Sequence, residues 1–375
     1  MKLGTIIRSY TLASMRAERP TADQRAWRAV LAAAEVGYRA GVAVRAWTFL
    51  GGLRTVRRLP CPVICVGNLT MGGSGKTPCV IALADWLRAR GHAVGILLRG
   101  YGRHDSGCAV VGDECGERGS WQRVGDEAVL IAQCLPGVPV VVGGNRFGAG
   151  RELLRRFRLD LLLLDDGFQH RHLHRDLDLV MLDATDPFGG GRLLPRGRLR
   201  EPISALRRAH AIILSRTDQA ADLSSLRQRL GGIVPGIPVI LSRHRPVRLR
   251  EFGSNRMVPL AELAGRRVLA LSGLASPEGF HRTLMDLGAV LAGSMVFPDH
   301  YAYAPDDILH AQERAENVAA QLIVTTEKDA VRIPIVEPGD MLARRLLVLG
   351  VVLEITEGQD ALEGLLRGCV GKACG

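Results

Sequence analysis

A glycine-rich segment that ends in lysine and threonine is the first stretch whose residue types could do chemistry. Residues 67–78 read GNLTMGGSGKTP, and three glycines there let the backbone approach a ligand closely, namely Gly72, Gly73 and Gly75. In a phosphate-binding loop, Lys76 would reach the β- and γ-phosphates of a nucleotide, and the Thr77 hydroxyl would bind magnesium. The strict pattern has glycine at the position of Thr70, so the loop is atypical. A glycine-rich turn with a fortuitous Lys-Thr is the alternative.

Paired aspartates at the end of an apolar run form a second candidate site. Residues 159–170 read LDLLLLDDGFQH, in which four leucines predict a buried strand that ends at Asp165 and Asp166. A P-loop protein keeps a magnesium-directed carboxylate at this place. Two like charges there need a cation or hydrogen-bond donors to offset them. Two solvated aspartates in a turn are the alternative.

A third candidate is Asp126 in the sequence GDEA, which lies between the glycine-rich loop and the paired aspartates along the chain. Transfer of a phosphate to an alcohol needs a carboxylate that accepts the hydroxyl proton, and Asp126 could fill that role. Its more ordinary interpretation is the N-cap of a helix.

Four arginines alternate with apolar residues in GGGRLLPRGRLREP, residues 189–202, which we call the arginine loop. They are Arg192, Arg196, Arg198 and Arg200. Charge runs are usually only solvated. Here the glycines and prolines exclude a helix face, and the alternation favours a binding site for a substrate that is both phosphorylated and apolar.

Short apolar runs separated by helical or loop segments must position these residues. Residues 63–66 predict a strand that enters the glycine-rich loop, and residues 80–87 predict an amphipathic helix that leaves it. Further strands at 93–98, 138–142, 159–164, 179–182 and 211–214 indicate a parallel sheet wrapped by helices. A second αβ series follows at 268–271, 294–297, 322–325 and 346–352. Glycines and prolines at 231–238 mark a boundary between a nucleotide-binding core, 59–232, and a smaller α/β domain, 233–375.

The formal net charge of +11 needs an anionic partner or surface to explain it. Only 5% of the residues are aromatic and no nucleic-acid-binding motif occurs, so DNA and RNA are disfavoured. A nucleotide, a phosphorylated substrate and an anionic membrane remain. No stretch makes a convincing transmembrane helix, because the longest uncharged run contains two prolines and a glycine.

The N-terminal segment, residues 1–58, contains a basic amphipathic helix. Between residues 22 and 53, apolar and aromatic residues recur at helical spacing: Trp27, Val30, Leu31, Ala34, Tyr38 and Val42. Arg25, Arg28 and Arg39 lie beside this stripe. Such a helix can lie in the interface of a bilayer, or it can pack on the domain; the pattern alone does not decide between the two.

Seven motifs together resemble one family. VICVGNLTMGGSGKTP, LLRGYGR, VGDE, LDDGFQH, LLPRGRLREP, FPDHYAY and TTEKDAVR occur in the order found in the tetraacyldisaccharide 4'-kinases of lipid A biosynthesis. The resemblance covers residues 25 to 332 and implies a P-loop kinase-like α/β fold, with a parallel sheet between helices and a smaller second α/β domain. It also implies transfer of the ATP γ-phosphate, with Mg²⁺, to the 4'-hydroxyl of a tetraacylated glucosamine disaccharide 1-phosphate. The product is lipid IV A.

The resemblance also assigns roles and a location. It implies a peripheral protein on the anionic cytoplasmic face of the bacterial inner membrane, with no protein partner. It places ATP on Thr70, Gly72, Gly73, Ser74, Gly75, Lys76 and Thr77, and Mg²⁺ on Thr77 and Asp165. The implied catalytic residues are Asp126, Asp165, Asp166 and His300. The implied substrate-binding residues are Arg99, Tyr101, Gln169, His170, Arg200 and Glu201.

The chain departs from the family motifs at two positions, and two other interpretations of its motifs are disfavoured. Ala128 stands where the family often has proline, and Tyr301 stands where it often has a second histidine, so any role of that histidine is in doubt here. The alternating histidines 170, 172 and 174 share one face of a strand, but interleaved arginines disfavour a metal site. A GTPase switch or metal-insertion GTPase would need an Asn-Lys-x-Asp guanine reader, and the nearest segment, SRTD at 215–218, lacks both Asn and Lys.

Overall fold

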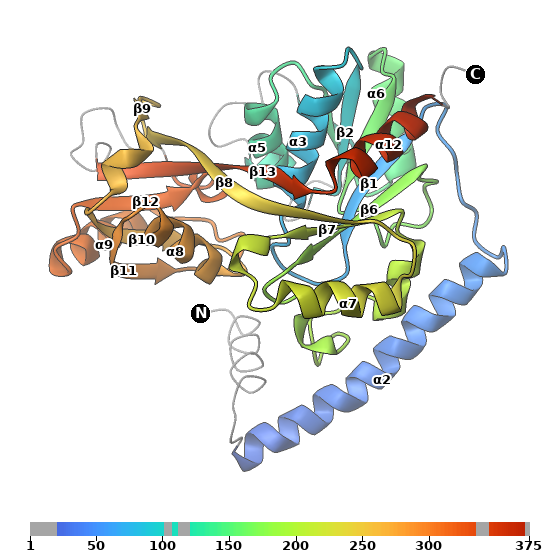
Figure 1. The fold of residues 1–375 in the computed structure, drawn as a ribbon, viewed down its shortest axis with the longest axis horizontal. Coiled ribbons are helices and arrows are strands. Elements are labelled where there is room, and N and C mark those ends of the chain that lie inside the picture. The colour runs from blue at the N-terminus through green and yellow to red at the C-terminus, as the bar shows by residue number, and fades with distance from the viewer. Residues whose placement is uncertain (1–20, 101–106, 112–120, 335–344, 372–375) are drawn as a thin grey trace.

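One mixed sheet runs through the molecule and carries both halves of the chain (Figure 1). The computed structural model describes residues 21–100, 107–111, 121–334 and 345–371. The strands lie in the order β11-β10-β12-β13-β8-β7-β6-β1-β5-β2-β4-β3, and β9 (Met257–Val258) pairs with β8 outside this path. The predicted mostly parallel α/β fold is confirmed.

The first half of the sheet positions the glycine-rich loop and the aspartates. Its strands are β1 (Val63–Asn68), β2 (Val94–Leu98), β3 (Ala109–Val111), β4 (Val140–Val142), β5 (Leu161–Asp165), β6 (Leu177–Asp183) and β7 (Ala211–Ser215). All these strands pair in parallel except the β3–β4 pair. Strands β1, β2 and β5 are buried at every residue, which explains their uninterrupted apolar sequences. Their carboxyl ends meet at one edge of the sheet.

Helices cover both faces of this half. On one face, α3 (Lys76–Arg88), α5 (Asp126–Cys134) and α12 (Gln359–Val370) share a hydrophobic core with the strands. On the other face lie α6 (Arg146–Arg156) and α7 (Leu223–Ile233). The short α4 (Trp121–Val124) precedes α5. Asn145 caps α6 by accepting the N–H of Gly148, and Asp222 caps α7 by accepting the N–H of Ser225.

The second half contains β10 (Arg267–Ser272), β11 (Val290–Val296), β12 (Leu322–Thr326) and β13 (Leu346–Glu357), with α8 (Pro277–Asp286), α9 (Pro305–Asn317) and α10 (Glu327–Ala330). The long strand β8 (Val239–Glu251) pairs in parallel with β7 and antiparallel with β13, and so joins the halves. Sequence analysis missed β8 because four arginines and a histidine interrupt its apolar pattern. The boundary near residue 233 stays a prediction; α12 returns from beyond it to pack on the first half.

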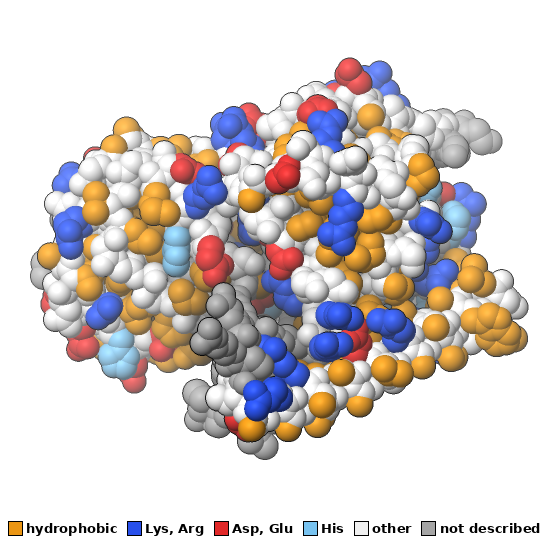
Figure 2. Space-filling view, turned by 60° about the horizontal axis from the view of Figure 1, so that its bottom comes forward, with side chains coloured by type: hydrophobic (Ala, Val, Ile, Leu, Met, Phe, Trp, Pro, Cys, Tyr) orange, Lys and Arg blue, Asp and Glu red, His pale blue; other side chains and the backbone are white. Residues whose placement is uncertain are grey.

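Helix α2 (Ala22–Leu50) forms a rod of 29 residues beside the body (Figure 1). Part of the apolar stripe predicted from sequence packs on the body, because Leu31 is buried, and Tyr38 and Val42 are partly buried, on the side that faces it. The opposite side is also apolar, as the orange edge of the rod shows in Figure 2. We call this side the outer face; its residues include Val30, Val36, Val44, Trp47 and Leu50, all 56–79% exposed. Because both sides are apolar, the helical spacing of apolar residues does not show which side faces the body. None of the helices in the described part of the chain combines the length and hydropathy needed to cross a bilayer.

Candidate active site

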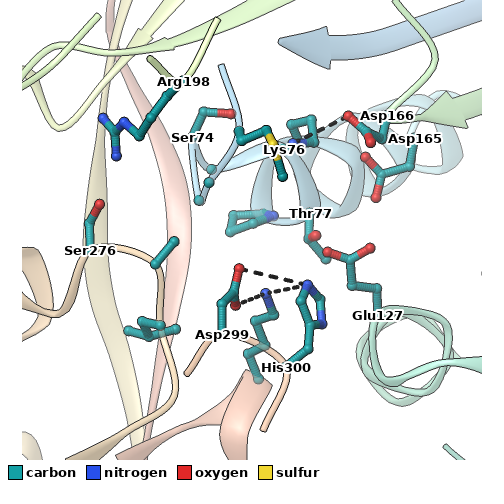
Figure 3. A pocket seen from close by; sticks show the side chains of 18 of the residues that line it. Ser74, Lys76, Thr77, Glu127, Asp165, Asp166, Arg198, Ser276, Asp299 and His300 are labelled. Atoms are coloured by element: carbon teal, nitrogen blue, oxygen red, sulfur yellow. Dashed lines mark hydrogen bonds and ion pairs between the residues drawn. The ribbon is translucent and has the colours of Figure 1, made fainter. Parts of the chain in front are cut away.

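A cavity of about 1460 Å³ opens at the carboxyl ends of the parallel strands, and residues from both halves line it (Figure 3). The first half contributes the glycine-rich loop, both aspartates and the arginine loop. The second half contributes residues 274–276 at the start of α8, Asp299 and His300, and the start of α10. Most residues singled out by their chemistry therefore meet in one place.

The glycine-rich loop has the geometry of a phosphate-binding loop. Six of its seven predicted nucleotide-binding residues line the cavity: Gly72, Gly73, Ser74, Gly75, Lys76 and Thr77. Gly75 has a φ of 83°, and a Cβ there would lie 2.7 Å from Nε2 of His244, so only glycine fits before α3 begins. Thr70 does not line the cavity; its backbone pairs with Leu199 of the arginine loop. Thr70 therefore supports the loop from the side away from the cavity. Nδ2 of the buried Asn68 donates a hydrogen bond to the carbonyl oxygen of Thr70 at 2.7 Å.

Asp166 lies between two cations, as Figure 3 shows for one of them. Its carboxylate is 3.4 Å from Nζ of Lys76, and Nη1 of Arg200 donates to both of its oxygens at 2.8 Å. Burial alone would raise the pKa of Asp166, but the charges of Lys76 and Arg200 outweigh burial and hold it well below its usual range. Asp166 also has a φ of 51°, rare for a residue with a side chain and typical of functional sites.

Asp165 has the opposite electrostatic character. Its side chain is buried, and its Oδ1 has no hydrogen-bond partner. Burial, with the negative charge of Glu127 second, raises the pKa of Asp165 to about 8. A buried carboxylate with an unsatisfied oxygen is suited to a cation.

The residues around Asp165 fit a magnesium ion. Thr77 and Glu127 line the same part of the cavity (Figure 3). Within the described ranges, no group of three or more His, Cys, Asp and Glu side chains makes a metal site, and this includes the alternating histidines. Magnesium is commonly held by one or two carboxylates together with substrate phosphates and water, so this donor set suits it. Sequence analysis missed Glu127 because the catalytic role in the sequence GDEA was assigned to Asp126 alone.

Asp126 and His300 meet across the two halves. His300 Nδ1 lies 2.8 Å from Oδ2 of Asp126, although the two residues are 174 positions apart. His300 lines the cavity and has a φ of 60°, whereas Asp126 is 6% exposed and does not line it. Nε2 of His300 lies 3.5 Å from Nζ of Lys328, which pairs with Asp299 at 3.0 Å. The imidazole, not the carboxylate, thus lines the cavity, with its Nε2 beside Lys328 and Asp299.

The ionised state of Asp126 is favoured by its neighbours. Burial would raise its pKa, but the hydrogen bond from His300 and the charges of His300, Lys328 and Arg332 lower it overall. The fully buried Arg332 lies 3.5 Å from Asp126 Oδ2 and also pairs with Asp329. Asp126 is therefore placed to orient His300. The role of Asp126 as the direct proton acceptor stays a prediction.

The predicted substrate-binding residues separate into two groups. Arg99, Gln169, His170 and Arg200 line the cavity. Glu201 does not line this cavity and pairs with Arg208, while Tyr101 lies outside the described residues. Burial and the charge of Arg146 lower the pKa of His170 to about 4, so His170 is neutral at physiological pH.

Arg146 is a cavity residue that sequence analysis missed. It is 4% exposed, its Nε has no hydrogen-bond partner, and burial together with Arg99 lowers its pKa to about 10. A buried guanidinium with unused donors beside two carboxylates suits an anionic or polar ligand group. The available signal was its place directly after the apolar run at 138–142, at the same edge of the sheet.

Comparisons with known proteins agree with this site. A model of the tetraacyldisaccharide-1-P 4'-kinase family matches residues 27–370. The tetraacyldisaccharide 4'-kinase of Anaeromyxobacter sp. (strain K) is 43% identical over 347 residues, 92% of this chain and 91% of its own. That of Syntrophus aciditrophicus (strain SB) is 39% identical over 356 residues, 92% and 94% of the two chains. LpxK from Aquifex aeolicus, solved in complex with ATP, has a TM-score of 0.71 at 32% identity and covers 92% of this chain and 99% of its own.

The chain belongs to the tetraacyldisaccharide 4'-kinase family. Its membership confirms the resemblance carried by the seven motifs. Family membership, like the missing Asn and Lys, argues against the GTPase alternative. In the segment that would hold the guanine reader, Arg216 pairs with Asp183 and Thr217 donates to the carbonyl of Ser242 at 3.0 Å. The side chains of Arg216 and Thr217 are thus bonded to other residues of the protein.

Proposed function

We infer that this chain transfers the γ-phosphate of ATP to the 4'-hydroxyl of a tetraacylated glucosamine disaccharide 1-phosphate, giving lipid IV A. The observation that carries this conclusion is that Lys76 and His300, from opposite halves, line one cavity, with Asp126 bound to His300 behind its wall. Phosphoryl transfer to an alcohol needs a cationic cradle for the phosphates and a base for the hydroxyl. The family membership supports the acceptor.

The phosphate-binding loop supplies the cradle. Its backbone N–H groups and Lys76 bind the β- and γ-phosphates and offset the charge that develops during transfer. Thr77, Asp165 and Glu127 are the residues that would hold Mg²⁺, which supplies further neutralisation of the phosphate oxygens. Arg200 also pairs with Asp166, so this carboxylate would keep a cationic partner when Lys76 binds the nucleotide.

The His300–Asp126 pair supplies the base. With its ring proton on Nδ1 and donated to Asp126, His300 would accept the proton of the 4'-hydroxyl at Nε2, in place of the contact with Nζ of Lys328 at 3.5 Å. Asp126 holds the ring in this tautomer and stabilises the imidazolium that forms, as a carboxylate does in a catalytic triad. The two residues come from different halves, so we propose that closure of the halves, divided near residue 232, completes the site and excludes water.

The acceptor reaches the cavity from a membrane surface. We propose that Arg99, Arg146, His170 and the arginine loop bind its polar head group, and that the outer face of α2 lies on the anionic cytoplasmic leaflet of the inner membrane. The outer face is apolar and exposed, and Arg25 and Arg39 on the same helix are exposed. A basic helix of this kind binds in the interface of a bilayer without crossing it.

Phosphate transfer to the lipid acceptor tests the function directly. The purified protein would be given detergent-dispersed tetraacyldisaccharide 1-phosphate and Mg²⁺, with ATP or GTP as donor. We expect acceptor-dependent transfer from ATP. Nucleotide hydrolysis that requires a protein partner and produces no phosphorylated lipid would contradict the proposal.

A further inference from the structure

The side of α2 that faces the body carries a carboxylate where an apolar contact would be expected. Glu35 is 4% exposed, although it lies on a helix whose outer face is open to solvent. Its Oε1 accepts the N–H of Leu193 at 3.1 Å, and its Oε2 lies 3.5 Å from Nη1 of Arg196. Both residues belong to the arginine loop. Burying a carboxylate costs free energy unless hydrogen bonds and ion pairs offset it, and apolar packing alone would hold the helix against the body equally well. The contacts of Glu35 therefore point to a role beyond docking.

A second contact joins the same helix to the other end of the arginine loop. The hydroxyl of Tyr38 donates to the carbonyl oxygen of Arg200 at 2.9 Å. Tyr38 lies one turn after Glu35, so one side of the helix reaches the loop at two points, Leu193 and Arg200. The side chain of Arg200 is the one that pairs with Asp166 in the cavity.

The arginine loop is in turn bonded through its backbone to the phosphate-binding loop. The N–H of Met71 donates to the carbonyl of Arg198, and the N–H of Arg200 donates to the carbonyl of Leu69, each at 2.7 Å. Thr70 and Leu199 pair between them. A displacement of residues 198–200 would therefore displace the strand-to-loop turn that places Lys76.

We propose that Glu35 and Tyr38 are positioning residues, which hold the arginine loop and, through it, Arg200 and the phosphate-binding loop in the geometry of transfer. The proposal rests on the proposed kinase function. Because the outer face of the same helix is the proposed membrane contact, attachment to the bilayer and alignment of the catalytic loops share one rigid element. The two roles lie on opposite sides of α2 and can be separated by substitution.

The test compares Glu35→Ala with Glu35→Gln, using detergent-dispersed acceptor so that membrane attachment does not limit the rate. We expect Glu35→Ala to lower kcat by about tenfold to a hundredfold, the scale for catalytic groups moved by a distant change. Glu35→Gln should stay within about threefold of the unmodified protein, because its amide oxygen still accepts the N–H of Leu193. Flotation with anionic vesicles should be unchanged in both. Glu262→Ala is the matched control, since Glu262 pairs with Arg266 four residues later, as Glu35 pairs with Arg39, but lies on an exposed turn away from the arginine loop.

Unchanged turnover in Glu35→Ala would overturn the proposal, as would a loss seen only with vesicles and not in detergent. If Glu35→Ala lacks a cooperative thermal transition, Tyr38→Phe decides instead. This variant removes one hydroxyl, and we expect a loss of about two- to tenfold in kcat, the range for one hydrogen bond; no loss would refute the positioning role. Absence of lipid phosphorylation by the unmodified protein would refute the kinase function itself, which keeps the two failures distinct.

Discussion

Replacing Asp126 by asparagine tests the His300–Asp126 pair most specifically. The oxygen Oδ1 of Asp126 accepts the N–H of Glu127 at 3.0 Å, while Oδ2 faces Nδ1 of His300 at 2.8 Å and Nε of Arg332 at 3.5 Å. An asparagine has one oxygen for these two places. If its oxygen stays on the Glu127 N–H, its NH₂ group faces His300 and forces the ring proton onto Nε2. The imidazole then cannot accept a proton from the hydroxyl.

The expected magnitude follows from the loss of the base. General base catalysis contributes about a hundredfold to ten-thousandfold, or about 2.7–5.4 kcal/mol of barrier. We therefore expect Asp126→Asn to lower kcat within this range and to leave the KM for ATP nearly unchanged, because Asp126 does not line the cavity in which the phosphate-binding loop lies. The assay is steady-state transfer from γ-labelled ATP to detergent-dispersed acceptor. Asp222→Asn serves as the control, since asparagine also caps a helix. An unchanged kcat, or a raised KM for ATP with unchanged kcat, would refute the reasoning.

Three further outcomes are expected. Lys76→Ala should abolish nearly all transfer because the phosphate charge is left uncompensated, and it should be measured with the same transfer assay; activity near that of the unmodified protein would contradict the role of the loop. Burial raises the pKa of Asp165 from its usual 3.8 to about 8, so folding favours its protonated form, and its contribution to stability is complete below pH 3.8 and is lost as the pH rises through 8. Asp165→Asn should thus raise the melting temperature of the magnesium-free protein more at about pH 9 than at about pH 6, and an equal effect at both would be inconsistent with that pKa. Serine at Val36, Val44, Trp47 and Leu50 should weaken flotation with anionic vesicles while leaving thermal stability unchanged, and high salt should release the unmodified protein in part; flotation equal to that of the unmodified protein would exclude the outer face as the membrane contact.

Local sequence was sufficient for the phosphate-binding loop and for the strands of the first half. The glycines before Lys76 and the leucines before Asp165 each determine their own turn or strand, and both lie where the sequence predicts them. Strand β8 escaped prediction because it lies between the two halves of the sheet and carries charged residues that are only partly buried or exposed. For α2, two apolar sides made the sequence pattern ambiguous, and only packing shows which one faces the body.

The functional contacts that sequence could not supply are all long-range. The pairing of Asp126 with His300 spans 174 residues, and that of Glu35 with Leu193 spans 158. In the first case the family resemblance named both residues, but only the fold brings them into contact. In the second, a glutamate within an alanine-rich helix has the sequence of a solvated surface residue. Its burial depends on the arginine loop, which no helical pattern specifies.

The position of the transferred phosphate tests the central claim most directly. The lipid product made with γ-labelled ATP would be isolated and analysed by phosphorus–proton correlation NMR. We predict a single new phosphate, derived from the γ position, on the 4'-oxygen of the distal glucosamine. Label found only in inorganic phosphate, or on another hydroxyl of the acceptor, would contradict the assignment of this cavity as the site of 4'-phosphorylation.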